Sequence, residues 1–339
     1  MPADAAPKAA IFGCGGQQLT DEERRFFADA QPLGFILFGR NCDTPDQIAR
    51  LVADLRLSVG REDAPVLIDQ EGGRVARLRP PHWPEYPAGS AYGAIYARDR
   101  EAGLEAARLG ARMIAADLHR LGIDVDCLPV LDVPSPDAHD VIGDRAYGDD
   151  PAVVADIGRA AADGLLAGGV LPVIKHIPGH GRARADTHHE LPVVETVRAD
   201  LARTDFAPFR ALSDLPIGMT AHVVFSDIDP DHPATTSKTV IADIVRGEIG
   251  FDGLLLTDDL NMQALSGSLG DRAAASLAAG CDIALHCSGE MAEMREVAAA
   301  VGAMTDPAVR RFDRCRGQIA APEALDIDSS RRRLQDLLC

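Results

Sequence analysis

The 339-residue chain has 34 Lys and Arg residues against 52 Asp and Glu residues, and this formal net charge of −18 argues against nucleic acid as a partner. Hydrophobic residues make up 46% of the chain and charged residues 25%, which excludes a disordered or collagen-like protein. The apolar stretches are far shorter than the ~18 residues needed to span a bilayer, and residues 1–7 do not resemble a secretory signal. We therefore expect a cytoplasmic protein that has no membrane partner.

Eight short apolar runs recur along the chain, and each predicts a buried strand. In chain order they cover residues 9–12, 34–38, 65–68, 125–131, 170–174, 217–221, 253–257 and 282–285. Most of them lack strict alternation, which is typical of parallel strands covered on both faces. Amphipathic stretches rich in Ala, Leu, Arg and Glu predict helices over residues 44–59, 98–121, 151–167, 197–212, 238–249 and 288–303.

This alternation predicts an α/β fold, and the number of strands distinguishes its two common forms. Eight runs in about 300 residues match a (β/α)8 TIM-like barrel, whereas an open doubly wound sheet usually has fewer strands and an early phosphate-binding glycine loop. The glycine cluster at residues 13–16 lacks the GxGxxG spacing and predicts a tight turn. Because no linker divides the chain, we expect residues 1–339 to form a single barrel domain, with residues 320–339 as a C-terminal tail or terminal helix.

The seven cysteines are an odd number and include no CxxC pair, which argues against a disulfide framework or a thiolate metal site. Cys127 and Cys281 lie among apolar residues, where we expect small buried side chains. No cysteine is a candidate nucleophile.

Ionisable residues follow five of the predicted strands. They are Asp69, Asp132, Lys175 with His176, His222 and Asp258. A barrel enzyme carries its chemistry on the loops after the C-terminal ends of its strands, so these side chains are expected to meet at one end of the barrel. Any one of them could be an ordinary polar loop residue, but their coincidence at five strand ends predicts an active site.

The segment 175–189 is the densest of these regions and holds four of the ten histidines, at positions 176, 180, 188 and 189. Imidazoles are common zinc ligands, but Pro178-Gly179 disfavours the regular helix that places two histidines on one face. A second interpretation pairs Asp186 with His188, because the carboxylate can orient and charge the imidazole for proton transfer. A third is a solvated polar loop. We favour the pair, with no metal and no cofactor.

Four segments together resemble glycoside hydrolase family 3 β-N-acetylglucosaminidases. They are residues 175–181 (KHIPGHG) followed by Asp186-Thr187-His188, residues 69–77 (DQEGGRVAR), residues 143–148 (GDRAYG) and residues 250–260 (GFDGLLLTDDL). The matches run from about residue 11 to residue 290 in the family's order. Ile177 replaces the usual Phe, and Thr187 and Thr257 replace Ser, so no reacting group is lost.

The resemblance implies a retaining glycosidase in which Asp258 is the nucleophile and His188, partnered by Asp186, is the acid/base. It further implies that five residues hold the hydroxyls of a terminal N-acetylglucosamine: Asp69, Arg77, Arg145, Lys175 and His176. A nucleophilic carboxylate must be ionised and rigidly held, which a strand end in a barrel mouth provides. We expect Asp259 to be structural, and the roles of Glu71 and His222 stay open.

The length of the chain resembles the compact, single-domain bacterial form of the family. That form acts in the cytoplasm on N-acetylglucosamine linked β-1,4 to anhydro-N-acetylmuramic acid, with or without peptide, during cell-wall recycling. We accordingly expect a monomeric catalytic barrel whose partner is an N-acetylglucosamine-containing muropeptide. Three alternatives are a phosphorylase, a non-catalytic sugar-binding barrel and a metal-dependent hydrolase.

Overall fold

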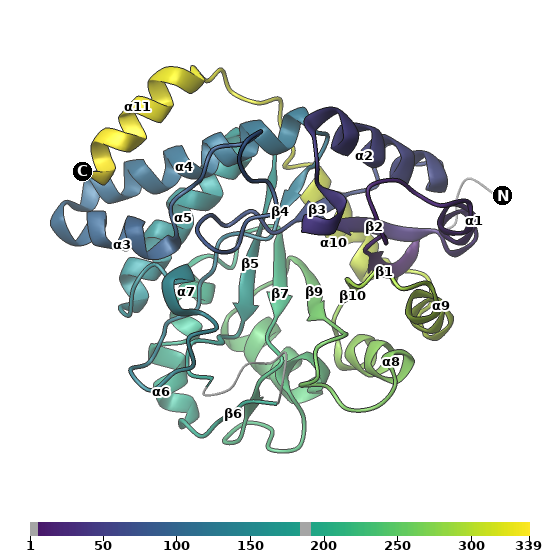
Figure 1. Ribbon diagram of the computed structural model, residues 1–339. Coiled ribbons are helices and arrows are strands. Elements are labelled where there is room, and N and C mark those ends of the chain that lie inside the picture. Colours follow the sequence, from purple (N-terminus) through teal and green to yellow (C-terminus); the bar gives the residue numbers. More distant parts are fainter. Residues whose placement is uncertain (1–5, 184–190) are drawn as a thin grey trace.

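The computed structural model describes residues 6–183 and 191–339, and within them eight parallel strands close into a barrel (Figure 1). In barrel order the strands are β1 (Lys8–Phe12), β2 (Pro32–Leu37), β3 (Val66–Ile68), β4 (Val125–Asp126), β5 (Leu171–Ile177), β7 (Ile217–Thr220), β9 (Leu254–Asp259) and β10 (Ile283–His286). Strand β1 closes the ring, since Phe12 is in register with Phe35 of β2 and with His286 of β10. Each of the eight predicted runs overlaps one of these strands, and the predicted (β/α)8 barrel is confirmed.

Helices surround the barrel (Figure 1). They are α1 (Asp21–Ala30), α2 (Pro45–Val59), α3 (Gly89–Arg98), α4 (Arg100–Arg120), α5 (Pro151–Ala167), α6 (Arg198–Arg203), α7 (Phe206–Ala211), η4 (Val240–Glu248), α8 (Leu269–Ala279), α9 (Met291–Ala300), α10 (Asp306–Arg316) and α11 (Ile327–Leu338), with short turns η1 (Gly39–Asn41), η2 (Gly143–Arg145) and η3 (Ala234–Thr236). Two further short strands, β6 (Val193–Val194) and β8 (Val224–Phe225), pair apart from the barrel. Helix α2 shows the local logic: the Thr44 side chain caps it, Pro45 opens it, and Gly60 ends it in the left-handed conformation.

Two predicted elements are shorter or more divided than expected, and a proline lies within each. The predicted helix over 197–212 is wrong as a single element, because Pro208 has no N–H to donate and the chain forms α6 and α7 instead. The predicted strand over 125–131 pairs regularly only at Val125 and Asp126. Pro129 likewise cannot donate to the ladder, although Val130 still bridges to Lys175.

Most of the hydrophobic core lies in two layers, one inside the barrel and one between the strands and the helices, because successive side chains of a strand point to opposite faces. In β3, Leu67 joins the cluster inside the barrel, while its neighbours Val66 and Ile68 pack toward the helices. All three are at most 1% exposed, which explains why the sequence shows no polar face. Burial of a side chain of this size contributes about 1.5–3 kcal/mol, so the two layers together hold the strand ends in place.

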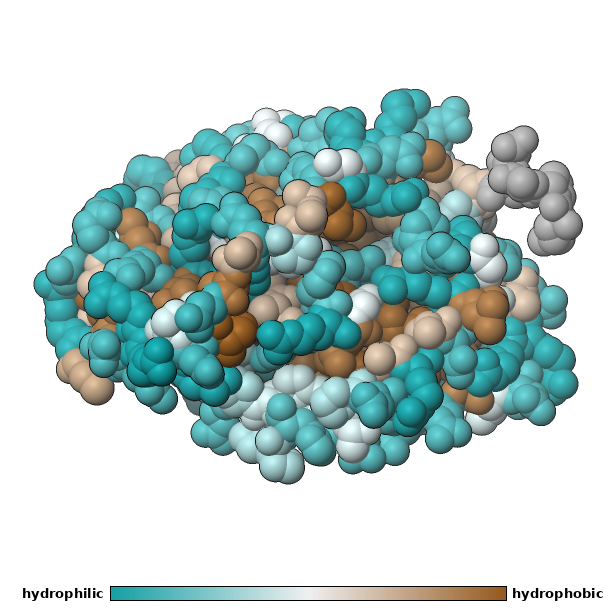
Figure 2. All heavy atoms as spheres, turned by 90° about the horizontal axis from the view of Figure 1, so that it is seen from above, coloured by the Kyte–Doolittle hydropathy of each residue, from teal (hydrophilic) through white to brown (hydrophobic). Residues whose placement is uncertain are grey.

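The C-terminal residues form a terminal helix that is docked on the barrel's outer layer. Figure 1 shows α11 beside α4. Leu334 is buried, and the guanidinium of Arg333 binds both carboxylate oxygens of Glu105 on α4 at 2.7 and 2.6 Å. Figure 2 shows a mostly hydrophilic surface, with apolar side chains gathered in its hollows. Among the described helices, none combines the length and the apolar character needed to cross a membrane.

Candidate active site

The C-terminal ends of the strands surround a cavity of about 490 Å³. Its lining includes Asp69, Arg77, Arg145, Lys175, His176 and Asp258. The structure thus brings together every predicted site residue that it describes, from segments up to 189 positions apart (258 − 69). Asp186 and His188, the predicted acid/base pair, lie outside the described residues.

Lys175 is the most deeply placed of these side chains, with 2% of its surface exposed near the end of β5. Its Nζ lies 2.8 Å from Asp69 Oδ1 and 2.7 Å from Glu71 Oε1. Asp69 follows β3 directly and also accepts a 3.0 Å hydrogen bond from Arg77 Nη2. Two carboxylates from one loop therefore hold a lysine that comes from a strand two positions further around the barrel.

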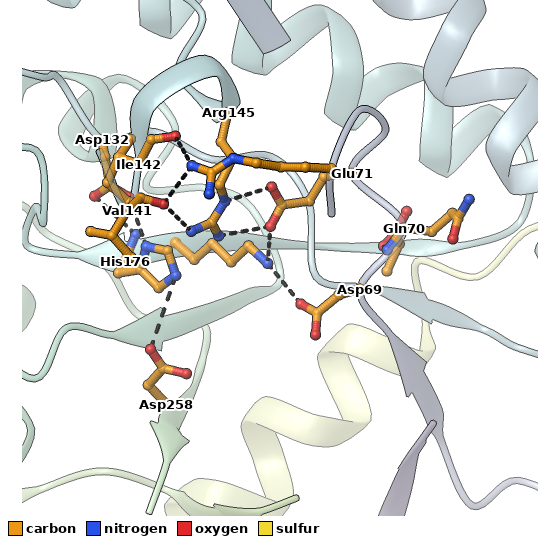
Figure 3. Close-up of polar contacts among 12 residues, drawn as sticks. Asp69, Gln70, Glu71, Asp132, Val141, Ile142, Arg145, His176 and Asp258 are labelled. Atoms are coloured by element: carbon orange, nitrogen blue, oxygen red, sulfur yellow. Dashed lines mark hydrogen bonds and ion pairs between the residues drawn. The ribbon is translucent and has the colours of Figure 1, made fainter. Parts of the chain in front are cut away.

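Glu71 is a central member of the site whose role the sequence left open. Its two carboxylate oxygens accept hydrogen bonds from Arg145 Nε at 2.9 Å and Arg145 Nη2 at 2.8 Å, in the bidentate geometry that suits an arginine fork. Figure 3 shows Glu71 directed at the Arg145 guanidinium, with Asp69 nearby. The signal in the sequence was the spacing, because residues two apart in an extended segment lie on the same side as Asp69 and Glu71 do.

The charges of this cluster stabilise one another. Burial opposes the ionised forms of both carboxyls. Lys175 and Arg77 nevertheless lower the pKa of Asp69, and Lys175 and Arg145 lower the pKa of Glu71. In the same way burial opposes the charge on Lys175, while Asp69 and Glu71 raise its pKa. Asp69, Glu71 and Lys175 are therefore held in their charged forms beside the guanidinium groups of Arg77 and Arg145. Three cations and two carboxylates leave one net positive charge and fixed N–H donors, which suit a ligand rich in hydroxyls.

Asp258 occupies the opposite part of the cavity, near the end of β9. Burial opposes its ionisation, yet the nearby imidazoles of His176 and His222 and the N–H of Asp259, 2.8 Å from Oδ1, lower the pKa of Asp258. Its Oδ2 lies 4.0 Å from His176 Nε2 (Figure 3). An ionised carboxylate held in a strand and facing a polar cavity is suited to nucleophilic attack.

Asp132 is the buried residue that organises the segment containing His176. Its Oδ2 lies 2.7 Å from His176 Nδ1, and its Oδ1 accepts the backbone N–H of His176 at 3.2 Å and of His180 at 2.7 Å. These contacts fix the ring between Asp132 and Asp258. Gly181 completes the packing, because a Cβ at this position would lie 2.0 Å from the carbonyl oxygen of Val133. The second glycine of the KHIPGHG segment is thus required by close backbone approach.

Two residues support the end of β9 that carries Asp258. Asp259, which also lines the cavity, accepts the backbone N–H groups of Asn261 and Cys287 at 3.1 and 3.2 Å with its Oδ1, and its structural role stays a prediction. The fully buried ring of His222 lies with Nδ1 2.7 Å from Thr235 Oγ1 and Nε2 3.0 Å from the carbonyl oxygen of Asp259. Because a carbonyl can only accept, Nε2 carries a hydrogen, and His222 anchors the β9 terminus rather than facing the cavity.

The four histidines considered above as an alternative metal site are only partly described, because His188 and His189 lie outside the described residues. Within residues 6–183 and 191–339, no three His, Cys, Asp or Glu side chains are placed to hold a metal ion. Burial, followed by the nearby His176, lowers the pKa of His180 to about 4, so this ring is neutral near neutral pH. Absence of a metal and of a cofactor stays a prediction.

A (β/α)8 barrel whose strand ends present an ionised carboxylate to a cavity lined with charged N–H donors fits a glycoside hydrolase. The chain belongs to glycosyl hydrolase family 3, since the model of the family's N-terminal domain matches residues 8–314. This match confirms the family resemblance found in the sequence.

Relatives and solved structures agree with this family. The chain is 36% identical over 334 residues to a beta-hexosaminidase of Bordetella avium, covering 97% of this chain and 94% of the relative. It is similar to the structure of NagZ from Neisseria gonorrhoeae in complex with N-trifluoroacetyl-D-glucosamine, with a TM-score of 0.88, 30% identity and 99% of both chains covered. A glycoside hydrolase family 3 beta-N-acetylglucosaminidase from Paenibacillus sp. str. FPU-7 gives a TM-score of 0.85 at 32% identity. The match covers 97% of this chain and 66% of that longer chain.

Proposed function

We propose that the chain is a retaining exo-β-N-acetylglucosaminidase that removes a terminal N-acetylglucosamine through a glycosyl-enzyme on Asp258. The observation that carries this proposal is the position of an ionised Asp258 across one cavity from the Lys175, Arg77 and Arg145 donors. The beta-hexosaminidase name of the relatives and the glucosamine derivative bound to the Neisseria structure support the choice of sugar.

In the first step a carboxylate oxygen of Asp258 forms a bond to the anomeric carbon while the bond from that carbon to the leaving oxygen breaks. The predicted acid His188, charged with the help of Asp186, gives its proton to the leaving oxygen. In the second step water attacks the same carbon, His188 takes a proton from it, and the bond to Asp258 breaks. The donors around Asp69 and Glu71 would hold the sugar hydroxyls, and contacts that strengthen in the transition state raise the rate.

The natural substrate we propose is N-acetylglucosamine β-1,4-linked to anhydro-N-acetylmuramic acid, with or without peptide, in cytoplasmic cell-wall recycling. This follows from the compact bacterial form that the sequence resembles, and the near-complete mutual coverage with the Neisseria structure supports it. We further propose that residues 1–339 act as one monomeric catalytic domain.

The first test is hydrolysis of p-nitrophenyl N-acetyl-β-glucosaminide beside the corresponding glucoside and galactosaminide, with and without phosphate and with and without a chelator. We expect free N-acetylglucosamine as the product and activity that resists chelation. Sugar 1-phosphate as the main product would instead indicate a phosphorylase. Loss on chelation with recovery on adding zinc would indicate a metal-dependent hydrolase, and an inert protein that binds N-acetylglucosamine would indicate a sugar-binding barrel.

The nucleophile is tested by covalent trapping with a 5-fluoro glycosyl fluoride and mass spectrometry of the peptides. We expect the adduct on Asp258, no turnover in Asp258→Ala, and persistent trapping in Asp259→Ala. An adduct on Asp259 would overturn the assignment.

The acid/base role is tested by comparing leaving groups in His188→Ala. General acid–base catalysis contributes about 10²–10⁴-fold, so a sugar leaving group should be slowed by this factor, whereas an activated phenol should be spared in the first step and give a burst. Asp186→Asn should show a milder version of both effects. Equal slowing of both substrates without a burst would show that His188 is not the acid/base.

A further inference from the structure

Arg74 belongs to the DQEGGRVAR segment, but none of the roles proposed above uses it. Its side chain crosses from the loop after β3 to the turn formed by residues 140–145, which ends in Arg145. Arg74 Nη2 donates to the carbonyl oxygens of Asp140, Val141 and Ile142 at 2.8, 2.9 and 3.1 Å, and Nε donates to Asp144 Oδ1 at 2.7 Å.

These contacts gather three successive carbonyl groups around one guanidinium. Figure 3 shows the carbonyls of Val141 and Ile142 on the side of the turn where the Arg145 guanidinium also lies. Arg145 Nη1 itself donates to the carbonyl of Val141 at 3.2 Å. The turn that delivers Arg145 to Glu71 is therefore held from the side of the cavity by Arg74, which also lines this cavity.

The backbone of the turn leaves little freedom to compensate for the loss of these contacts. Gly143 has a φ of +46°, and a Cβ there would lie 2.3 Å from Asp140 Oδ1. Below the turn, Ile142 is buried in a small cluster with Val130 and Ala146. This cluster holds the turn by apolar packing, and the hydrogen bonds from Arg74 hold it on the side of the cavity.

The ion pair between Arg74 and Asp144 contributes little to holding the 140–145 turn in place. The two side chains are 46% and 48% exposed, and exposed pairs typically contribute less than about 1 kcal/mol. The forked geometry toward the carbonyls matters more, because a lysine offers a point charge that cannot reproduce it.

We propose that Arg74 is a positioning residue that fixes the 140–145 turn so that Arg145 is presented to Glu71 and to the bound sugar. The inference rests on the proposed function, in which Arg145 contacts a sugar hydroxyl. It assigns to the GGR part of one motif the task of orienting the GDR part of the other.

The test compares Arg74→Ala and Arg74→Lys with the control Arg79→Ala on p-nitrophenyl N-acetyl-β-glucosaminide. Arg79 lies in the same loop and is also exposed, but it donates to the carbonyls of Ala76 and Arg74 and not to the turn. A displaced binding group costs about 10–100-fold, so we expect this loss in kcat/KM, mainly through KM, in both Arg74 variants and near-native values in Arg79→Ala. Melting temperatures should stay close to that of the wild type.

Two further measurements show whether Arg74 acts through Arg145. Added guanidinium ion should restore part of the activity of Arg74→Ala, because the site is open to solvent, whereas methylammonium should not. Adding Arg74→Ala to Arg145→Ala should cost little more than Arg145→Ala alone, since residues that act through one another are not additive.

Additive losses, full activity of Arg74→Lys, or an Arg74→Ala enzyme with native kinetics would each overturn the inference. If Arg74→Ala does not fold, Arg74→Lys carries the test with the same expected loss. A wild-type protein that is inactive on the N-acetylglucosaminide would instead refute the proposed function. An active wild type that is impaired by Arg145→Ala but not by Arg74→Ala would refute the role of Arg74 alone.

Discussion

Replacing Glu71 by Gln removes one negative charge from the centre of the buried cluster and keeps the shape of the side chain. In the native structure Glu71 is 4% exposed and binds Arg145 at two atoms and Lys175 at 2.7 Å. The substitution Glu71→Gln would leave these two cations sharing a site with Asp69 as the remaining anion. The nitrogen of the new amide would also face a donor.

The expected cost follows from the burial of the partners. Breaking a buried ion pair by removing one member costs about 3–5 kcal/mol, because a charge is left uncompensated. Gln retains one acceptor oxygen, so we expect Glu71→Gln to lower the free energy of unfolding by about 3 kcal/mol. It should also lower kcat/KM on the order of 10²-fold, since Arg145 and Lys175 lose their common anchor.

The dependence on pH gives a second signature. Although burial opposes ionisation, Lys175 and Arg145 lower the pKa of Glu71 from 4.5 to about 2 in the folded state. A carboxyl whose pKa is lowered by folding stabilises the protein above its unfolded pKa and loses this contribution as the pH falls through the folded value. The difference in free energy of unfolding between wild type and Glu71→Gln should therefore be largest above pH 4.5 and decrease steadily as the pH falls toward 2.

The assay is urea unfolding of both proteins across this range, with Glu105→Gln as the matched control. Glu105 makes the same bidentate contact to Arg333, but these side chains are 45% and 52% exposed. The control should cost less than about 1 kcal/mol. Equal losses for the two variants, or a Glu71→Gln protein with native stability and native kcat/KM, would refute the argument from burial.

Three other substitutions test the supports of the site. In Asp132→Asn the amide would donate to His176 Nδ1 and move the ring hydrogen, so kcat/KM should fall on the order of 10²-fold. Steady-state kinetics measures this loss, and an unchanged circular dichroism spectrum shows that the fold is intact. Gly143→Ala should raise KM, because the left-handed backbone costs about 1–2 kcal/mol and the new methyl group meets Asp140; a native KM would contradict this. Burial raises the pKa of Asp259 to about 6, so the native protein should lose stability as the pH rises from about 4 to 6, and melting curves of Asp259→Asn should lack this loss.

The sequence was most informative about the order of the strands. Buried parallel strands must be apolar on both faces, as Val66, Leu67 and Ile68 are, so each produces a visible run. The barrel's geometry then places the residues after the runs in one mouth, which is why Asp69, Lys175 and Asp258 could be grouped without coordinates. The limits of elements were less predictable, because one proline changes them without changing the apolar pattern.

Side-chain partnerships could not be predicted in the same way. Asp132 was a candidate because it follows a predicted strand, and Glu71 lies two residues after Asp69, but their partners His176 and Arg145 lie 44 and 74 positions away and could not be identified. His222 was a candidate because it follows a strand, but its ring contacts Thr235 and the β9 backbone. Direction of a side chain depends on tertiary contacts, and these are not encoded in periodicity.

The shortness of β4 has a consequence for the barrel as a whole. With two residues in its regular ladder, β4 leaves part of the backbone pairing with β5 to the irregular segment that follows it, where the N–H of Leu131 donates to the carbonyl of Lys175 and the N–H of Lys175 donates to that of Pro129. Side chains add to this pairing, since Asp69 and Glu71 after β3 bind Lys175 on β5 directly, and Asp126 of β4 accepts the backbone N–H of Gln70. The groups proposed to bind the sugar thus also hold neighbouring parts of the barrel together. A change of sugar specificity at these positions would weaken the barrel where its regular strand pairing is shortest, so new specificities should arise more readily from the surrounding loops.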